Sequence, residues 1–224
     1  MTSDLAPSIQ HTLIEVGITR DRMIAHCEEA VAYSFNAAMV PGSWVPLAAE
    51  VLAGTGIPVA SALDFPTVGV MTSAGKAAEA AELVRLGATQ IDIGVQIGWL
   101  KSGMFDAFRE DIAGVVRASG VPIKVMLELP LLTEAEKEAA VELSVEAGAA
   151  FLKNASSGQI ETANVDSIRY LVERAPAGVK VKASGSIKSL TQARELLAAG
   201  AVLLGTSAGV AIVSDRADGD TASY

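Results

Sequence analysis

Two lysines each end a short apolar run that is typical of a buried β-strand. The runs are residues 149–153 (AAFLK) and 179–182 (VKVK), which end at Lys153 and Lys182. Lysine is rarely buried, because taking its ammonium group out of water is costly and lowers its pKa. A lysine with a lowered pKa is a nucleophilic amine that can form a Schiff base with a carbonyl compound, and a nearby cation lowers the pKa further. The alternative is that both side chains simply reach water from strand ends.

Asp92 lies between two isoleucines in a third apolar run, residues 90–98 (QIDIGVQIG). Beside lysines, such a carboxylate would stay ionised, hold the ammonium groups in place and relay protons. A structural ion pair would leave the same pattern, and that alternative stays open. The residue types predict Lys153, Lys182 and Asp92 as a catalytic group.

Two glycine-containing turns late in the chain are candidates for binding phosphate. They are residues 183–188 (ASGSIK) and 205–209 (GTSAG), and each precedes a segment typical of a helix. Backbone N–H groups and the dipole at a helix start attract anions, although such turns are often only turns. The predicted phosphate-binding residues in these two turns are Gly185, Ser186, Lys188, Gly205 and Ser207.

The histidines and the single cysteine, Cys27, have no zinc-site spacing, so we predict no metal and no cofactor. His26 is expected to pack or to lie on the surface. For His11, orienting the neighbours of Asp92 and filling the barrel are both open. Glu128 is a candidate polar lid contact.

Strand-like and helix-like segments alternate along the chain in eight β-then-α units. Glycines follow the helical segments, as helix C-termini favour. We predict strands near residues 8–12, 36–40, 57–63, 89–95, 121–128, 149–153, 179–183 and 201–205, and helices at 20–34, 43–54, 73–87, 104–118, 134–147, 164–174 and 190–199, with a short one after Thr206. The count predicts a single-domain α/β protein, a (β/α)₈ TIM barrel over residues 1–213 with a flexible C-terminal tail over 214–224. An open doubly wound sheet is the alternative, but the first βα turn has no glycine fingerprint.

In such a barrel, polar residues at the C-terminal strand ends are catalytic candidates. The polar residues predicted there are His11, Thr12, Asp64, Asp92, Gln96, Glu128, Lys153, Lys182 and Ser184.

Composition limits the partners of this 224-residue chain. The net charge of −9 and an aromatic content of 4% argue against binding nucleic acid or anionic membranes. We find no signal sequence and no apolar run long enough to cross a bilayer. The expectation is a cytoplasmic protein with small-molecule substrates, and a homodimer is plausible for so alanine-rich a chain.

Taken together, these motifs resemble the deoxyribose-phosphate aldolase family of class I aldolases, which are (β/α)₈ barrels. The similarity runs from residue 11 to the end of the chain and is most specific at residues 91–98, 100–103, 151–153, 181–185, 205–207 and 222–224. The resemblance implies that Lys153 is the Schiff-base lysine, that Lys182 lowers its pKa, and that Asp92 relays protons. It also implies that Tyr224 reaches the active site from the tail. The implied reaction is reversible cleavage of 2-deoxy-D-ribose 5-phosphate to D-glyceraldehyde 3-phosphate and acetaldehyde.

The chain departs from the family pattern at several positions around the predicted site. Gln10 stands where the family usually has Asp, Gln96 where it has Asn, Ser186 where it has a second glycine, and Ala208 where it has a second serine. After Lys153 the chain reads NASSG, residues 154–158, where the family reads TSTG, which leaves Ser156 as a substrate-binding candidate.

These departures spare the amines and alter the groups expected at the sugar and phosphate ends. Two alternatives therefore stay open: an aldolase acting on another aldehyde or phosphosugar, and a non-covalent phosphosugar-binding or isomerase barrel whose lysines are structural. A regulatory barrel without turnover is a third.

Overall fold

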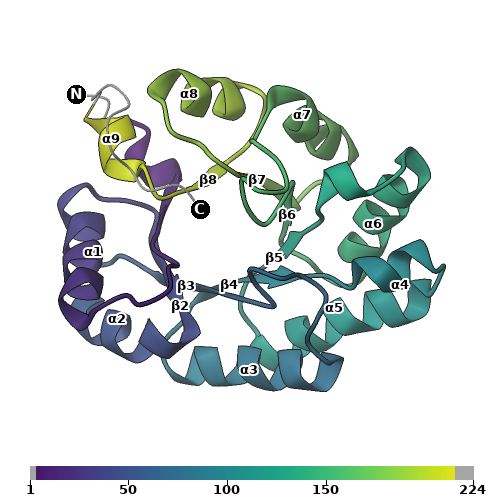
Figure 1. Ribbon diagram of the computed structural model, residues 1–224, viewed down its shortest axis with the longest axis horizontal. Helices are drawn as coiled ribbons and strands as arrows, with labels where there is room; N and C mark the ends of the chain where they lie inside the picture. Colours follow the sequence, from purple (N-terminus) through teal and green to yellow (C-terminus); the bar gives the residue numbers. More distant parts are fainter. Residues whose placement is uncertain (1–3, 215–224) are drawn as a thin grey trace.

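Eight short parallel strands form a closed barrel, with β8 paired to β1 (Figure 1). The computed structural model describes residues 4–214. The strands are β1 Ile9–Thr12, β2 Ala37–Pro41, β3 Val59–Leu63, β4 Gln90–Gly94, β5 Ile123–Met126, β6 Phe151–Lys153, β7 Lys180–Ser184 and β8 Leu203–Thr206. The predicted (β/α)₈ fold class is confirmed.

Helices surround the barrel and cover the outer face of the strands (Figure 1). They are α1 Arg20–Ala32, α2 Val45–Leu52, α3 Ser73–Arg85, α4 Ile97–Lys101, α5 Phe105–Ser119, α6 Glu134–Glu146, α7 Val165–Arg174, α8 Leu190–Ala198 and α9 Gly209–Val213, with 3₁₀ turns at Ala6–Ser8, Gly42–Trp44 and Leu129–Leu131. Side-chain caps start many of them: at α6, Thr133 and Glu136 form a reciprocal capping box. Because both faces of each strand are covered, the strands read as apolar runs without alternation, and β5 is buried throughout.

The observed elements differ from the predicted ones at several ends. Strands β3 and β5 begin two residues later than predicted, after Pro58 and Pro122, because proline has no N–H to donate to a ladder. Strand β5 also ends before Glu128, whose φ of 52° leaves the extended conformation. Helix α4 was not predicted, because its five residues are too few for a periodic pattern.

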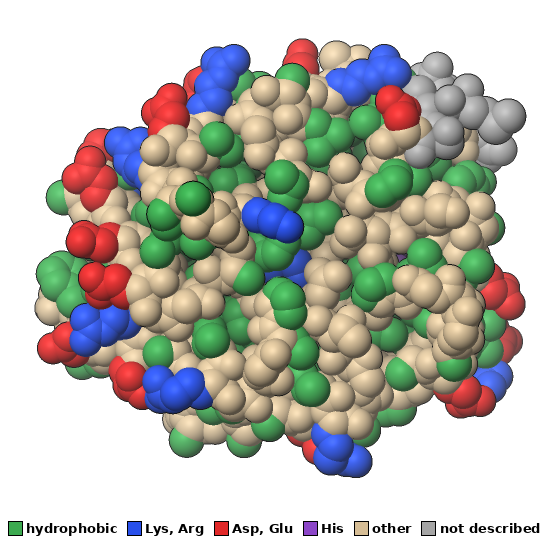
Figure 2. Space-filling view, turned by 180° about the vertical axis from the view of Figure 1, so that it is seen from behind, with side chains coloured by type: hydrophobic (Ala, Val, Ile, Leu, Met, Phe, Trp, Pro, Cys, Tyr) green, Lys and Arg blue, Asp and Glu red, His purple; other side chains and the backbone are tan. Residues whose placement is uncertain are grey.

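Charged side chains lie mostly at the periphery of the face that Figure 2 shows. On the face shown in Figure 2, acidic and basic side chains alternate at the periphery, and the centre carries Lys or Arg without Asp or Glu. Among the described residues, no helix is long and apolar enough to cross a membrane.

A buried ion cluster lies between the sheet and helices α3 and α5. Lys76 on α3 pairs with Asp111 at 2.7 Å and with Asp64 at 3.1 Å, and it donates a hydrogen bond to the carbonyl of Gly94. Asp64 also accepts three backbone N–H groups, those of residues 69–71, and so fixes the loop that follows β3. Asp64 was predicted among the catalytic candidates, but its contacts make it an anchor for this loop.

We expect Lys76→Met to lower the free energy of unfolding by about 3–5 kcal/mol, because two buried carboxylates lose their cation. Urea denaturation measures the change. The control is Arg85→Met, which breaks an exposed pair with Glu82 and should change stability by no more than about 0.5 kcal/mol. Equal losses in the two variants would contradict a structural role for the cluster.

Candidate active site

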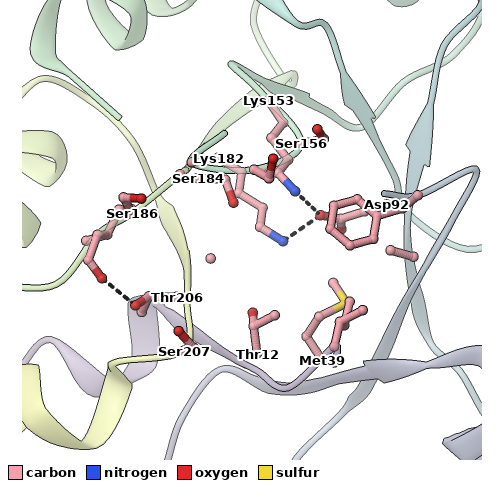
Figure 3. A pocket seen from close by; sticks show the side chains of 18 of the residues that line it. Thr12, Met39, Asp92, Lys153, Ser156, Lys182, Ser184, Ser186, Thr206 and Ser207 are labelled. Carbon is pink, nitrogen blue, oxygen red and sulfur yellow. Dashed lines mark hydrogen bonds and ion pairs between the residues drawn. The ribbon is translucent and has the colours of Figure 1, made fainter. Parts of the chain in front are cut away.

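Three lysines surround one buried carboxylate at the floor of the barrel mouth. On β4, the Asp92 Oδ2 atom lies 2.6 Å from Lys182 Nζ and 3.1 Å from Lys153 Nζ (Figure 3). Asp92 Oδ1 lies 3.3 Å from Nζ of Lys124 on β5. The fold therefore brings the three residues predicted as catalytic into direct contact, from strands β4, β6 and β7.

Lys124 was missed by the sequence analysis. It lies opposite Asp92 in the β4–β5 register and is fully buried, and within residues 4–214 its Nζ has no hydrogen-bond partner besides the ion pair. A lysine within an apolar run is the sequence signal for such a group, and Lys124 shows it, since apolar residues stand on both sides of it. It was overlooked because it lies within its strand instead of at the end.

The cluster holds three lysines and one carboxylate, and this imbalance together with burial shifts the pKa values of its side chains. Burial raises the pKa of Asp92, but Lys182, Lys153 and Lys124 together hold it below its usual value, so Asp92 stays ionised. Burial lowers the pKa of Lys182 well below that of an ordinary lysine, and the two other lysines lower it further, while Asp92 opposes them. The pKa of Lys124 is lowered too, chiefly by burial. The arrangement therefore lowers the pKa of two buried amines, those of Lys182 and Lys124.

A pocket opens above the cluster, at the C-terminal ends of the strands. The predicted binding residues that line it are Ser156, Gly185, Ser186, Lys188, Gly205 and Ser207. Lys153, Lys182 and Asp92 form its inner end, and Figure 3 shows Thr12 and Met39 on the opposite side. The pocket thus joins the amines to the two glycine-containing loops.

The two loops are tied to each other and to their neighbours. The hydroxyl of Thr206 donates to the carbonyl of Ile187 at 2.6 Å, which joins the loops after β7 and β8. Gly185 has a φ of 116°, and a Cβ there would lie 2.0 Å from the carbonyl oxygen of Glu161, so only glycine fits. Ser186 adopts a φ of 47°, an unusual conformation for a residue with a side chain.

The segment after Lys153 is held from two sides. Asn154 clips β6 to β7, because its side chain donates to the carbonyl of Ser184 and accepts the N–H of the same residue. The backbone N–H of Ser156 donates to Glu128 at 2.9 Å. Glu128 was expected to be a polar lid contact, but it is buried beneath this segment, and burial raises its pKa.

The remaining polar candidates act elsewhere or support the loops. His11 pairs with Glu29 on α1 at 2.8 Å and stacks on His26, with ring centroids 4.4 Å apart, so it fills the space outside the strands. Burial lowers the pKa of His26 to about 2. The two rings are inclined by only 23°, so their in-plane lone pairs cannot meet at one metal ion.

Gln96 donates to the carbonyl of Met71 and supports the loop after β3. Tyr224 lies outside the described residues.

Comparisons with known proteins identify the family. No protein-family model matches the chain. It is 42% identical to the deoxyribose-phosphate aldolase of Methanothermobacter thermautotrophicus over 211 residues, which are 94% of each chain. It is 38% identical to the enzyme of that name from Halalkalibacterium halodurans, over 98% of this chain and 99% of the relative. The chain belongs to the deoxyribose-phosphate aldolase family.

Solved structures agree with this placement. The structure of "QR15, an Aldolase" superposes with a TM-score of 0.89 at 29% identity and covers 95% of each chain. The deoxyribose phosphate aldolase of Aeropyrum pernix, described as a tetramer, has a TM-score of 0.87 at 28% identity, covering 96% of this chain and 92% of that one. The predicted family and the predicted class of enzyme, an aldehyde lyase, are confirmed.

Removing Lys124 should raise the pKa of Lys182, because one of the two cations that disfavour its ammonium form is lost. We expect Lys124→Met to move the titration of Lys182 to higher pH, measured by NMR of lysine labelled at Cε and assigned with a Lys182→Met variant. Lys180→Met, an exposed lysine on the same strand, should leave that titration in place. An unchanged titration in Lys124→Met would show that Lys124 does not belong to the cluster.

Proposed function

We propose that this protein reversibly cleaves 2-deoxy-D-ribose 5-phosphate to D-glyceraldehyde 3-phosphate and acetaldehyde through a Schiff base on Lys153. The observation that carries the proposal is the buried carboxylate of Asp92 shared by lysine amines that line one pocket. A barrel that only binds a phosphosugar has no need for such a group. The names of the relatives support the choice of substrate.

Lys153 is better suited than Lys182 to be the nucleophile. Lys153 is 5% exposed and Lys182 is 1% exposed. Lys182 donates hydrogen bonds of 2.5 and 2.6 Å to two partners, whereas Lys153 donates one of 3.1 Å to Asp92. The amine of Lys153 is therefore less constrained and closer to an entering carbonyl group.

The chemistry follows from an uncharged amine beside a proton carrier. The Lys153 amine adds to the C1 carbonyl carbon, and loss of water with uptake of one proton from a neighbouring acid gives a protonated imine; the final hydrolysis returns that proton. A base then takes the proton of the C3 hydroxyl, the C2–C3 bond breaks, and its electron pair forms an enamine while glyceraldehyde 3-phosphate leaves. The enamine takes a proton at C2, and water releases acetaldehyde. Lys182 and Asp92 would hold and transfer these protons.

The phosphate would lie between the loops after β7 and β8. Ser186, Lys188 and Ser207 line that part of the pocket, and the backbone amides of both loops add neutral donors. This local site is needed because the chain as a whole has a net charge of −9. Tyr224 stays a proposed proton carrier on the family resemblance alone, and the homodimer and the cytoplasmic location stay predictions.

We expect Lys153→Ala to abolish the covalent adduct that borohydride forms with acetaldehyde and to lower kcat by on the order of 10³-fold or more. Trapping followed by peptide mapping locates the adduct in the wild type. The exposed Lys101→Ala variant should keep both adduct and activity. An adduct mapped to Lys182 would overturn the assignment, and no adduct at any lysine would favour a non-covalent phosphosugar barrel.

Lys188→Ala should lower kcat/KM for 2-deoxyribose 5-phosphate by roughly tenfold, since one charge-assisted contact to the phosphate is lost. It should leave kcat/KM for unphosphorylated 2-deoxyribose unchanged. Lys180→Ala, which removes a lysine outside the pocket, serves as the control. Equal wild-type efficiency on the two sugars would indicate an aldolase for another substrate.

A further inference from the structure

The side of the pocket that faces the amines is apolar. Ile14, Met39, Ala62 and Phe65 line this side, and they come from strands β2 and β3 and from the loops after β1 and β3. Figure 3 shows Met39 across the pocket from Lys153. We call these four residues the apolar wall, because their side chains contain no nitrogen or oxygen atom.

The apolar wall extends from the barrel interior to the reactive cluster. Met39 is 2% exposed and packs with two alanines in a small hydrophobic cluster inside the barrel, and Ile14 and Ala62 pack against the same cluster. Ala62 lies opposite Asp92 in the β3–β4 register. An apolar surface therefore begins on the strand next to the carboxylate that holds the amines.

The buried ion cluster around Lys76 fixes Phe65 in this wall. Phe65 directly follows Asp64, which Lys76 and the N–H groups of residues 69–71 hold in place. Asp64 has a φ of 55°, a conformation that a residue with a side chain keeps only when its surroundings hold it. The position of Phe65 is thus set before any ligand enters the pocket.

The hydroxyl groups next to the apolar wall already donate their hydrogens within the protein. Thr12 donates to the carbonyl of Gln10 at 3.0 Å. Ser61, which precedes Ala62 on β3, donates to the carbonyl of Val40 at 2.9 Å. A ligand hydroxyl group placed against the wall would lose its hydrogen bonds to water, and the wall would replace none of them, which makes such a contact unfavourable.

We propose that the apolar wall determines specificity for the donor aldehyde: it accepts a C2 atom that carries hydrogen or a methyl group and rejects one that carries a hydroxyl group. This inference rests on the proposed aldol cleavage, in which C1 is bound to Lys153 and the phosphate lies between the loops after β7 and β8. C2 is bonded to C1, so it stays at the inner end of the pocket, with Lys182 and Asp92 on one side and the apolar wall on the other. A 2-deoxy sugar fits this position, and a sugar with a C2 hydroxyl does not.

The donor half of the reaction tests the wall without any phosphate. The aldehyde and Lys153 form a protonated imine with loss of water and uptake of one proton, and a base removes a proton from C2 to give the enamine. In heavy water a deuteron adds at C2, and hydrolysis releases the labelled aldehyde, which NMR detects. Propanal and 2-hydroxyacetaldehyde suit this test, because they are similar in size and differ in the group on C2. We expect Met39→Gln, which places an amide in a similar volume, to raise the exchange rate of 2-hydroxyacetaldehyde relative to that of propanal by about tenfold.

Three further variants separate polarity from packing. Met39→Leu keeps an apolar side chain of similar size and should leave the ratio of the two rates as in the wild type. Met104→Gln makes the same substitution at an exposed methionine outside the pocket and should change neither rate. Ile14→Thr, at a half-buried position of the wall, should shift the ratio in the same direction as Met39→Gln, so the test does not depend on the folding of one variant.

The proposal is overturned if the ratio stays unchanged in the polar variants that fold. It is equally overturned if Met39→Leu shifts the ratio as much as Met39→Gln does, because packing would then be the cause. Borohydride trapping separates this result from the proposed function. Adducts of both aldehydes at Lys153 without a shift in the ratio refute the role of the wall alone, whereas the absence of any adduct in the wild type refutes the aldolase and the donor site with it.

Discussion

The site depends on one buried carboxylate shared by three lysines. Asp92 lies between Lys182, Lys153 and Lys124, and all four side chains are removed from water. One carboxylate cannot fully compensate three ammonium groups in a medium of low polarity, and the pKa values of Lys182 and Lys124 are lowered as a result. The same imbalance that makes the core costly to bury makes it chemically reactive.

A comparison with the second buried cluster supports this interpretation. Around Lys76, two carboxylates surround one cation, Asp64 also accepts three backbone N–H groups, and the group is closed off between sheet and helices. Around Asp92, cations outnumber the carboxylate, and the group opens into the pocket. The first arrangement holds its cation between two carboxylates and anchors a loop. The second places lysine amines, with Lys182 lowered in pKa, at the lining of a pocket that a small molecule can enter.

The barrel supplies the rigidity that such a cluster requires. Adjacent strands β4 to β7 each contribute one charged side chain, and hydrogen bonds between neighbouring strands fix their spacing. The loops above are fixed in the same way, through Thr206, Asn154 and Glu128. Glu128 and Ser186 hold left-handed backbone conformations next to the pocket, which is where proteins commonly tolerate local strain.

The sequence by itself determined the eight βα units, the closed barrel and the end of β6 at which Lys153 lies. Lys182 was predicted at a strand end but lies within β7, which continues to Ser184. Apolar runs and the glycines that follow helices are local signals, and each can be recognised within about a dozen residues. Only the tertiary structure decided which side chains face inward. In strands buried on both faces the pattern does not alternate, so nothing local distinguishes Gln10, which contacts Lys182, from His11, which turns to α1. Lys124 was missed because it lies in the middle of its predicted strand and not at the end. The charge of each amine depends on distances of a few ångströms between residues far apart in the chain, and such distances exist only after the barrel has closed.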